Sequence, residues 1–211
     1  MFDTEVLNAA GWKAAGNLHG LEMTDELLRA HIGTNKETTK RLMQNHFGPT
    51  FDFEAVRSDR IAHCLRHIEE NGTPLKPGLR ELLAYLDEKG LKTAIASSTD
   101  ERFVRFHLEH AALGHEFDAI ICGDKVKESK PEPDIFLTAL AELDVAAEEC
   151  LVLEDSYNGI TAAHRAGIRV VMIPDLLPPT SEIEKLFFRK ADVLTDVIPI
   201  IELFNSRALI P

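Results

Sequence analysis

The stretch Leu151-Val152-Leu153-Glu154-Asp155-Ser156-Tyr157-Asn158-Gly159 joins a short apolar run to a polar turn and the start of a helix. The apolar run predicts a buried strand, and Glu154 and Asp155 stand at its end. Two adjacent carboxylates repel each other unless a cation or a proton neutralises one of them. Mg²⁺ binds one or two carboxylates together with phosphate oxygens. The pair therefore suggests a magnesium site, although acidic residues at a helix N-terminus would give the same pattern.

On both sides of this stretch, short apolar runs alternate with amphipathic segments. The apolar runs predict strands at Thr93–Ala96, Ala119–Cys122, Leu151–Leu153, Val170–Ile173 and, more weakly, Asp192–Leu194. The amphipathic segments predict helices at Leu79–Lys89, Glu101–His110, Asp134–Leu143, Gly159–Ala166 and Glu182–Phe188. Short buried strands that alternate with helices are typical of βαβ units, in which helices cover both faces of a parallel sheet. The pattern therefore predicts a doubly wound α/β domain.

The first third of the chain has helical patterns and no strand-like alternation. The helix signals are Thr24 as a cap, Thr34–Glu37 as a capping box, Asp52 as a start and Asn71-Gly72 as a stop. A turn-rich segment, Thr73–Gly78, follows. We therefore expect a helical domain over residues 5–73, and an α/β domain made of residues 1–4 and 74–211.

The composition excludes several classes of function. The 211 residues carry 23 Lys and Arg against 35 Asp and Glu, a net charge of −12, and nucleic-acid binding needs clustered positive charge. No apolar run approaches the roughly 18 residues of a membrane span, and the N-terminus has no signal-peptide pattern. We therefore expect neither a nucleic-acid nor a membrane partner. Three cysteines without a CxxC pair are typical of a reducing compartment, so we expect a cytoplasmic protein.

A second polar segment follows the predicted strand Thr93–Ala96. Ser97, Ser98 and Thr99 place three hydroxyls between this strand and a helix start. Ligands of an open parallel sheet bind at the carboxyl ends of its strands. Hydroxyls and free backbone N–H groups at that edge suit a phosphate. The alternative is that Thr99 or Asp100 only caps the next helix.

The third polar segment is Lys127-Glu128-Ser129-Lys130-Pro131-Glu132-Pro133-Asp134. Its two prolines restrict the backbone and predict a fixed turn. Such a turn can hold the Lys130 ammonium in a constant position, where it would neutralise an anionic substrate. The alternative is a surface turn with a solvated lysine.

The order of these segments resembles that of the haloacid dehalogenase superfamily, specifically its β-phosphoglucomutase-like phosphatases. The resemblance covers essentially the whole chain, and it implies that the helical domain is a cap and that the protein is a Mg²⁺-dependent hydrolase of a small phosphorylated metabolite. By this resemblance, Ser97 would bind the transferring phosphoryl group and Lys130 would neutralise the phosphate and the nucleophile. Glu154 and Asp155 would hold Mg²⁺ directly or through water. Further substrate contacts are implied for Ser98, Thr99, Thr4, Lys36 and Asn158.

The resemblance also implies a first motif that the given chain does not contain. Family members carry a buried strand ending in Asp-x-Asp-Gly, where the first Asp is the nucleophile and the second is the general acid and base. Asp3-Thr4-Glu5 resembles the segment after that motif, and Asp3 is too far from the strand tip to act as the nucleophile. We therefore expect the motif before Met1, on a strand between Thr93–Ala96 and Leu151–Leu153, and expect the given chain to be inactive.

Two other functions are open at this stage. A sugar-phosphate mutase would use the same aspartyl phosphate, but Lys36 stands near a position where a mutase is expected to carry an arginine. A non-catalytic phosphate-binding relative would keep the polar strand ends and lack the nucleophile. The sequence determines neither the substrate nor the oligomeric state, for which a monomer is slightly favoured.

Overall fold

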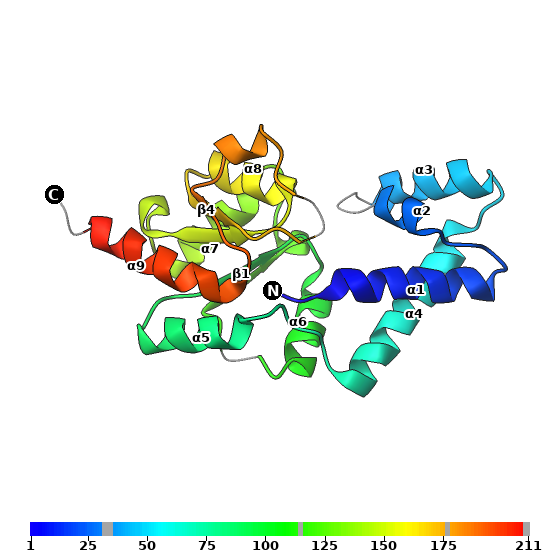
Figure 1. Ribbon diagram of the computed structural model, residues 1–211, viewed down its shortest axis with the longest axis horizontal. Coiled ribbons are helices and arrows are strands. Elements are labelled where there is room, and N and C mark those ends of the chain that lie inside the picture. The colour runs from blue at the N-terminus through cyan, green and yellow to red at the C-terminus, as the bar shows by residue number, and fades with distance from the viewer. Residues whose placement is uncertain (31–35, 114–115, 176–177, 209–211) are drawn as a thin grey trace. The chain divides into compact units, whose positions relative to one another are not determined.

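The computed structural model describes residues 1–30, 36–113, 116–175 and 178–208 (Figure 1). The chain divides into two compact units. The helical unit is Phe2–Pro74, and the α/β unit consists of Met1 and Leu75–Pro211. Among the described helices, none has both the length and the apolar character that crossing a lipid bilayer requires.

The described helices of the helical unit are α1 (Thr4–Leu18), α2 (Asp25–Ala30), α3 (Lys36–Phe47) and α4 (Phe53–Asn71). Two of the predicted caps are present. The Thr24 hydroxyl accepts a hydrogen bond of 3.2 Å from the N–H of Leu27, and the Asp52 carboxylate accepts one of 3.1 Å from the N–H of Ala55. The predicted capping box at residues 34–37 begins outside the described residues.

Helices α1 and α4 approach each other closely because α1 carries a glycine at the contact. A Cβ atom at Gly11 would lie 2.7 Å from Cys64 Sγ, so only glycine fits without displacing α4. Beside this contact, Trp12, Met43, Phe53 and Val56 are buried in the core of the unit. The helical unit therefore has its own hydrophobic core. That residues 5–73 act as a cap stays a prediction.

Within the described residues, the α/β unit contains five strands, whose observed pairings are all parallel. The strands are β1 (Ala94–Ser97), β2 (Ala119–Cys122), β3 (Leu151–Glu154), β4 (Arg169–Met172) and β5 (Arg189–Lys190). The helices are α5 (Leu79–Glu88), α6 (Glu101–His110), α7 (Asp134–Leu143), α8 (Tyr157–Arg165) and α9 (Val197–Ala208). Figure 1 shows α8 on one side of the strands and α5 on the other. The predicted α/β architecture with parallel strands is thus confirmed.

The segment between β4 and α9 corrects the sequence-based prediction. The expected helix Glu182–Phe188 is only a 3₁₀ turn at Ile183–Lys185, because a single turn already buries Ile183. The expected strand Asp192–Leu194 lies earlier, at Arg189–Lys190, where it pairs with the end of β4. The sequence analysis did not predict helix α9, because Pro199 interrupts the helical pattern there. Pro199 lies in the first turn of α9, where proline is tolerated.

The strands form two separate ladders, β1–β2 and β3–β4–β5. Within the described residues, β1 and β3 do not pair with each other, so each keeps one edge without a strand partner. The side chains of β3 and of its paired neighbour β4 differ in their exposure to solvent. Leu153 in β3 is 37% exposed, whereas Val170, Val171 and Met172 in β4 are fully buried. The predicted absence of a direct pairing between these two strands is confirmed.

Gly78 precedes α5 in a left-handed conformation, with a φ of 82°. A Cβ atom there would lie 2.8 Å from the backbone nitrogen of Thr195, so an alanine would combine backbone strain with a clash. We expect Gly78→Ala to lower the free energy of unfolding by about 3 kcal/mol, as measured by urea denaturation. Gly90 has a φ of 63° and open space around it, so Gly90→Ala should cost only about 1 kcal/mol. Equal losses at the two positions would contradict this packing argument.

Candidate active site

Lys130 connects the ends of β1 and β3. Its ammonium donates a hydrogen bond of 3.0 Å to the main-chain carbonyl of Ala96 and forms a short ion pair with Glu154. The side chains of Lys130 and Glu154 are only 10% and 9% exposed. Because a buried charge is unfavourable without an opposite charge beside it, each side chain depends on the other. The alternative of a solvated surface lysine is therefore wrong.

The Glu154 carboxylate is held by donors from its own turn as well. It accepts hydrogen bonds from the N–H groups of Asp155 and Ser156, each at 3.2 Å, and from the Ser156 hydroxyl at 3.0 Å. The Ser156 hydroxyl in turn accepts a hydrogen bond from the N–H of Gly159 and so caps α8. Together with Lys130, these donors occupy both oxygens of Glu154.

Asp155 has a different environment from its neighbour. Among the described residues, its carboxylate forms no ion pair, and part of the residue reaches solvent. The surrounding protein raises the pKa of the Asp155 carboxyl by desolvation, and the charges of Glu154 and Asp175 raise it further. The positive charge of the Met1 amino group opposes these effects and lowers this pKa. Asp155 is therefore the acid at this edge that forms no ion pair among the described residues.

The loop after β1 is shaped by contacts with the loop after β2. The Ser97 hydroxyl accepts a hydrogen bond of 3.2 Å from the N–H of Thr99, and the Thr99 carbonyl accepts one of 3.3 Å from the N–H of Gly123. Asp100 stands at the N-cap position of α6 but forms no cap with its side chain. Asp124 caps this helix instead, because its carboxylate accepts a hydrogen bond from the N–H of Glu101. Asp100 therefore does not cap α6 with its side chain.

The structure brings some predicted site residues together and leaves others apart. Ser97, Lys130, Glu154 and Asp155 lie at the carboxyl ends of β1 and β3, with Ser98 and Thr99 exposed in the loop after Ser97. Asn158 is exposed in the first turn of α8. Their roles in binding stay predictions.

Thr4 and Lys36 belong to the helical unit. Thr4 is the first residue of α1, and Lys36 is the first described residue of α3. The Lys36 ammonium lies 2.9 Å from a carboxylate oxygen of Glu54, and both side chains are about half exposed. Substrate contacts by these two residues stay predictions.

Sequence reasoning missed the ion pair between Lys76 and Asp175. The Lys76 ammonium lies 2.6 Å from a carboxylate oxygen of Asp175, and the two side chains are 20% and 19% exposed. Asp175 follows β4, so the rule that polar residues after apolar strands mark a site would have found it. Lys76 gives no such signal, because it lies in the turn-rich segment before α5.

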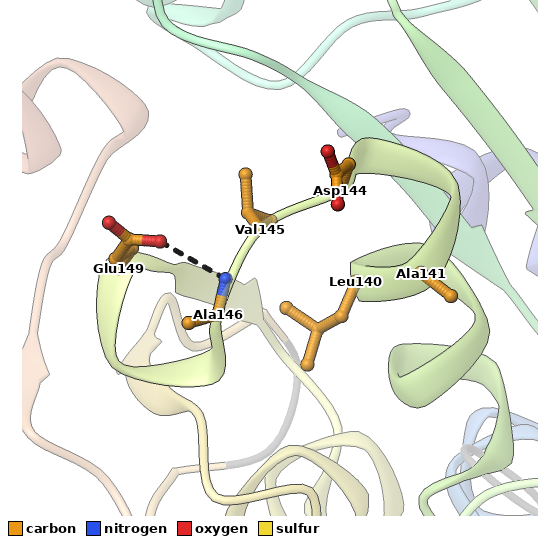
Figure 2. Close-up of a pocket in the computed structure, with 6 residues that line it drawn as sticks. All are labelled: Leu140, Ala141, Asp144, Val145, Ala146 and Glu149. Atoms are coloured by element: carbon orange, nitrogen blue, oxygen red, sulfur yellow. Dashed lines mark hydrogen bonds between the residues drawn. The ribbon is translucent and has the colours of Figure 1, made fainter.

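The pocket drawn in Figure 2 lies elsewhere. It has a volume of about 270 Å³ and is lined by Leu140, Ala141, Asp144, Val145, Ala146 and Glu149. These residues connect the end of α7 to the start of β3, which is the edge where the strands begin. In Figure 2, the Glu149 carboxylate is bonded to the N–H of Ala146 in the same connection. This pocket therefore does not belong to the candidate active site.

Comparisons with known proteins give a consistent result. The profile of the family described as haloacid dehalogenase-like hydrolase matches residues 1–173. The Thermotoga maritima phosphorylated carbohydrates phosphatase is 30% identical over 168 residues, which are 80% of this chain and 77% of that protein. YhcW of Bacillus subtilis is 39% identical over 138 residues, which are 65% of this chain. Those residues span 62% of YhcW, less than two thirds of its length.

Solved structures agree with the sequence comparisons. Two crystal structures of CbbY from Rhodobacter sphaeroides, one with phosphate and one with xylulose-(1,5)-bisphosphate, superpose on this chain with a TM-score of 0.74. Each is 25% identical in sequence and covers 93% of this chain, and the matched part is 91% of the CbbY chain. The resemblance found from the three polar segments is therefore confirmed.

The position of the Glu154 carboxyl group explains why residue 159 is glycine. A Cβ atom at Gly159 would overlap this carboxyl group, so Gly159→Ala would displace Glu154 from Lys130. We expect the variant to lose about 3 kcal/mol of unfolding free energy in urea denaturation. In a Glu154→Ala background the overlap is gone, and the same substitution should be neutral or stabilising, as is usual for alanine in a helix. A Gly159→Ala variant as stable as the parent chain would contradict the overlap.

The raised pKa of Asp155 predicts a specific pH dependence of stability. The folded chain binds a proton at Asp155 more readily than the unfolded chain, so stability falls as the pH rises from the ordinary pKa of 3.8 through the raised folded pKa. Asp155→Asn should therefore raise the melting temperature at neutral pH and leave it unchanged below pH 3.8. Glu202→Gln, at an exposed position within α9, is the control and should leave the melting profile unchanged. A uniform shift at every pH would refute the assignment.

Proposed function

The chain belongs to the haloacid dehalogenase-like hydrolase family, and on that premise we propose that it forms part of a Mg²⁺-dependent phosphatase of small phosphorylated metabolites. The observation that carries the proposal is the Lys130 ammonium, which lies between the Ala96 carbonyl at the end of β1 and the Glu154 carboxylate at the end of β3. A lysine that is only 10% exposed, beside the strand ends where ligands bind, suits an anionic ligand. The names of the relatives as phosphatases support the same function.

The residues at the strand ends suit a phosphate monoester. The Lys130 ammonium would neutralise a phosphate oxygen, and the Ser97 hydroxyl with the exposed loop Ser98-Thr99 would donate hydrogen bonds to the others. Asn158, exposed at the start of α8, offers an amide to the leaving group. These groups bind and orient the ester; none of them needs to form a bond to phosphorus.

The acidic pair fits a magnesium ion. Mg²⁺ takes one or two carboxylates and keeps several waters, and Asp155 forms no ion pair among the described residues. Glu154 already accepts four hydrogen bonds, so Asp155 would be the direct ligand and Glu154 would act through a water. Within the described residues, no cluster of three His, Cys, Asp or Glu side chains could hold a metal, so Asp155 and Glu154 would supply only part of the coordination sphere. The bound ion would neutralise the phosphate oxygens.

We place the nucleophile on a further strand between β1 and β3, before Met1 in the sequence. Both strands have an edge without a partner among the described residues, and Leu153 is exposed beside it. Met1 belongs to the α/β unit, where its carbonyl accepts a hydrogen bond of 2.9 Å from the N–H of Lys76. An aspartate at the end of this further strand would attack phosphorus, release the ester oxygen as an alcohol after protonation, and be regenerated when water hydrolyses the aspartyl phosphate. The given chain alone would then bind phosphate without turnover.

The substrate class that we propose is a phosphorylated sugar. The Thermotoga relative is named for phosphorylated carbohydrates, and one CbbY structure contains a sugar bisphosphate. In this proposal, the helical unit acts as a cap, and Thr4 and Lys36 contribute to substrate binding. A cytoplasmic location suits the protein, because Cys64, Cys122 and Cys150 are unpaired thiols.

The test is phosphate release by the protein extended upstream of Met1, measured across sugar monophosphates and bisphosphates with and without Mg²⁺. We expect Mg²⁺-dependent turnover, and a loss of about 100-fold in kcat for Lys130→Met. Lys92→Met removes the same charge at the other edge of the sheet, where the ammonium donates a hydrogen bond to the Leu143 carbonyl, and should keep full activity. Circular dichroism would show that both variants fold.

Other outcomes would favour the two alternative functions. Transfer of phosphate between sugar positions, with little net release and a need for a bisphosphate activator, would indicate a mutase. Tight binding of phosphate without turnover, together with no Asp-x-Asp-Gly upstream, would indicate a non-catalytic relative. Either result would overturn the proposed phosphatase.

A further inference from the structure

Residues 129–133 form the turn that carries Lys130, and this Lys130 turn has few hydrogen-bond donors of its own. Prolines precede and follow Glu132 and have no N–H group, so Glu132 supplies the only main-chain donor of the turn after the lysine. Its N–H donates a hydrogen bond of 3.0 Å to the Ser129 carbonyl. The Pro131 carbonyl and the Glu132 carboxylate are therefore available to partners outside the turn.

Arg165, the last residue of α8, binds the Lys130 turn at both of these groups. Its Nη1 atom donates a hydrogen bond of 3.1 Å to the Pro131 carbonyl and lies 2.5 Å from a carboxylate oxygen of Glu132. The two acceptors belong to the residues that directly follow Lys130. One guanidinium nitrogen thus holds both a main-chain group and a side chain immediately beyond the lysine.

The other end of α8 holds the ion-pair partner of Lys130. The Ser156 hydroxyl caps α8 and donates a hydrogen bond of 3.0 Å to the Glu154 carboxylate, which is paired with the Lys130 ammonium. The nine residues of α8 span about 14 Å and form a rigid spacer between its two ends. Helix α8 therefore contacts Glu154 through its first turn and the Lys130 turn through Arg165.

The Lys130 turn also determines where the next helix begins. The N–H of Phe136, in the first turn of α7, donates a hydrogen bond of 2.9 Å to the Pro133 carbonyl. The Lys130 ammonium lies 4.9 Å from the centre of the Phe136 ring, within the range of a cation–π contact. A displacement of the turn would therefore move both the lysine and the ring that its ammonium contacts.

We propose that Arg165 is a positioning residue that fixes the Lys130 turn and thereby keeps the Lys130 ammonium at the ends of β1 and β3. The inference rests on the proposed function, in which this ammonium neutralises the phosphate of the substrate. The alternative is a surface ion pair without consequence for the site. The side chains of Arg165 and Glu132 are 45% and 49% exposed, and such a pair adds little to stability. Loss of Arg165 should therefore change the position of Lys130 more than it changes the stability of the fold.

The first experiment measures the position of Lys130 without any substrate. Acetic anhydride labels the lysines of the folded 211-residue chain, and mass spectrometry gives the labelling rate of each one. Lys130 is only 10% exposed, so it should be labelled slowly in the parent chain. Arg165→Gln should raise its rate by about tenfold, because the turn opens locally, and should leave the rate of Lys92 unchanged.

Arg80→Gln is the matched control for this experiment. Arg80 also connects a helix to a neighbouring main chain, because its Nη2 atom donates a hydrogen bond of 2.6 Å to the Ala111 carbonyl. Neither residue belongs to the Lys130 turn, so Arg80→Gln should leave the labelling rate of Lys130 at the parent value. Urea denaturation of both variants would show that faster labelling does not come from a general loss of stability.

The second experiment is a double-mutant cycle on phosphate release by the protein extended upstream of Met1. Arg165→Gln should lower kcat by about tenfold, less than the roughly 100-fold expected for Lys130→Met. In a Lys130→Met background, Arg165→Gln should change kcat by no more than about twofold, since Arg165 acts only through the ammonium. Glu132→Gln keeps the bond of Arg165 to the Pro131 carbonyl and should cost only about threefold.

The outcomes separate the inference from the proposed function. The inference is overturned if Arg165→Gln leaves the labelling of Lys130 unchanged, or if Arg80→Gln accelerates it equally. Equal losses of kcat in the parent and Lys130→Met backgrounds would also overturn it, because Arg165 would then act by another route. If Arg165→Gln accelerates labelling while the extended protein shows no turnover, or keeps full turnover in Lys130→Met, the positioning stands and the proposed function is wrong.

Discussion

The ion pair between Lys130 and Glu154 is the contact on which the rest of the site depends. Both side chains are about nine-tenths buried, so loss of either would leave an uncompensated charge inside the α/β unit. Lys130 also donates to the Ala96 carbonyl, and it thereby connects the ladder of β1 and β2 with the ladder of β3, β4 and β5. Because Glu154 is fixed by this pair, its carboxyl group excludes any side chain at residue 159. A single electrostatic contact thus sets the geometry of the turn after β3.

The two ladders are held in one unit by their helices rather than by a shared ladder. Ile121 of β2 and Met172 of β4 belong to the same hydrophobic cluster, to which Phe136 of α7 and Ile160 of α8 also contribute. This common core explains how β1 and β3 can be parts of one unit without pairing among the described residues. The consequence for function is chemical as well as structural. Lys130 contacts the ends of both β1 and β3, each of which has an edge without a partner among the described residues, so a strand placed there would end among the groups that we propose to bind phosphate.

Elements whose core contacts come from neighbouring residues could be predicted from the sequence. The bounds of β2, α6 and α7 match their apolar patterns. Strand β3 extends one residue beyond its pattern, and β1 and β4 are each shifted by one residue. The region between β4 and α9 could not be predicted in this way. Its register depends on β4, whose carbonyls at Val170 and Met172 accept hydrogen bonds from Phe188 and Ala191, and no local pattern encodes that pairing. The candidate site shows the same division. Adjacent prolines pointed to Lys130 and a strand end pointed to Glu154 and Asp155, whereas no local sequence pattern distinguishes Lys76.

The amino-acid sequence by itself determined the α/β class, the order of the three polar segments and the residues that meet at the strand ends. These features follow from the alternation of apolar runs and from the rule that parallel strands end at one edge. Only the tertiary structure decided which charge is paired with which. Glu154 is neutralised by Lys130 and Asp175 by Lys76, while Asp155 keeps an unpaired carboxylate among the described residues. The physical reason is that an ion pair depends on the distance between two side chains in space. Lys130 and Glu154 are 24 positions apart in sequence, and Lys76 and Asp175 are 99 apart, so each pair becomes neighbours only in the folded chain.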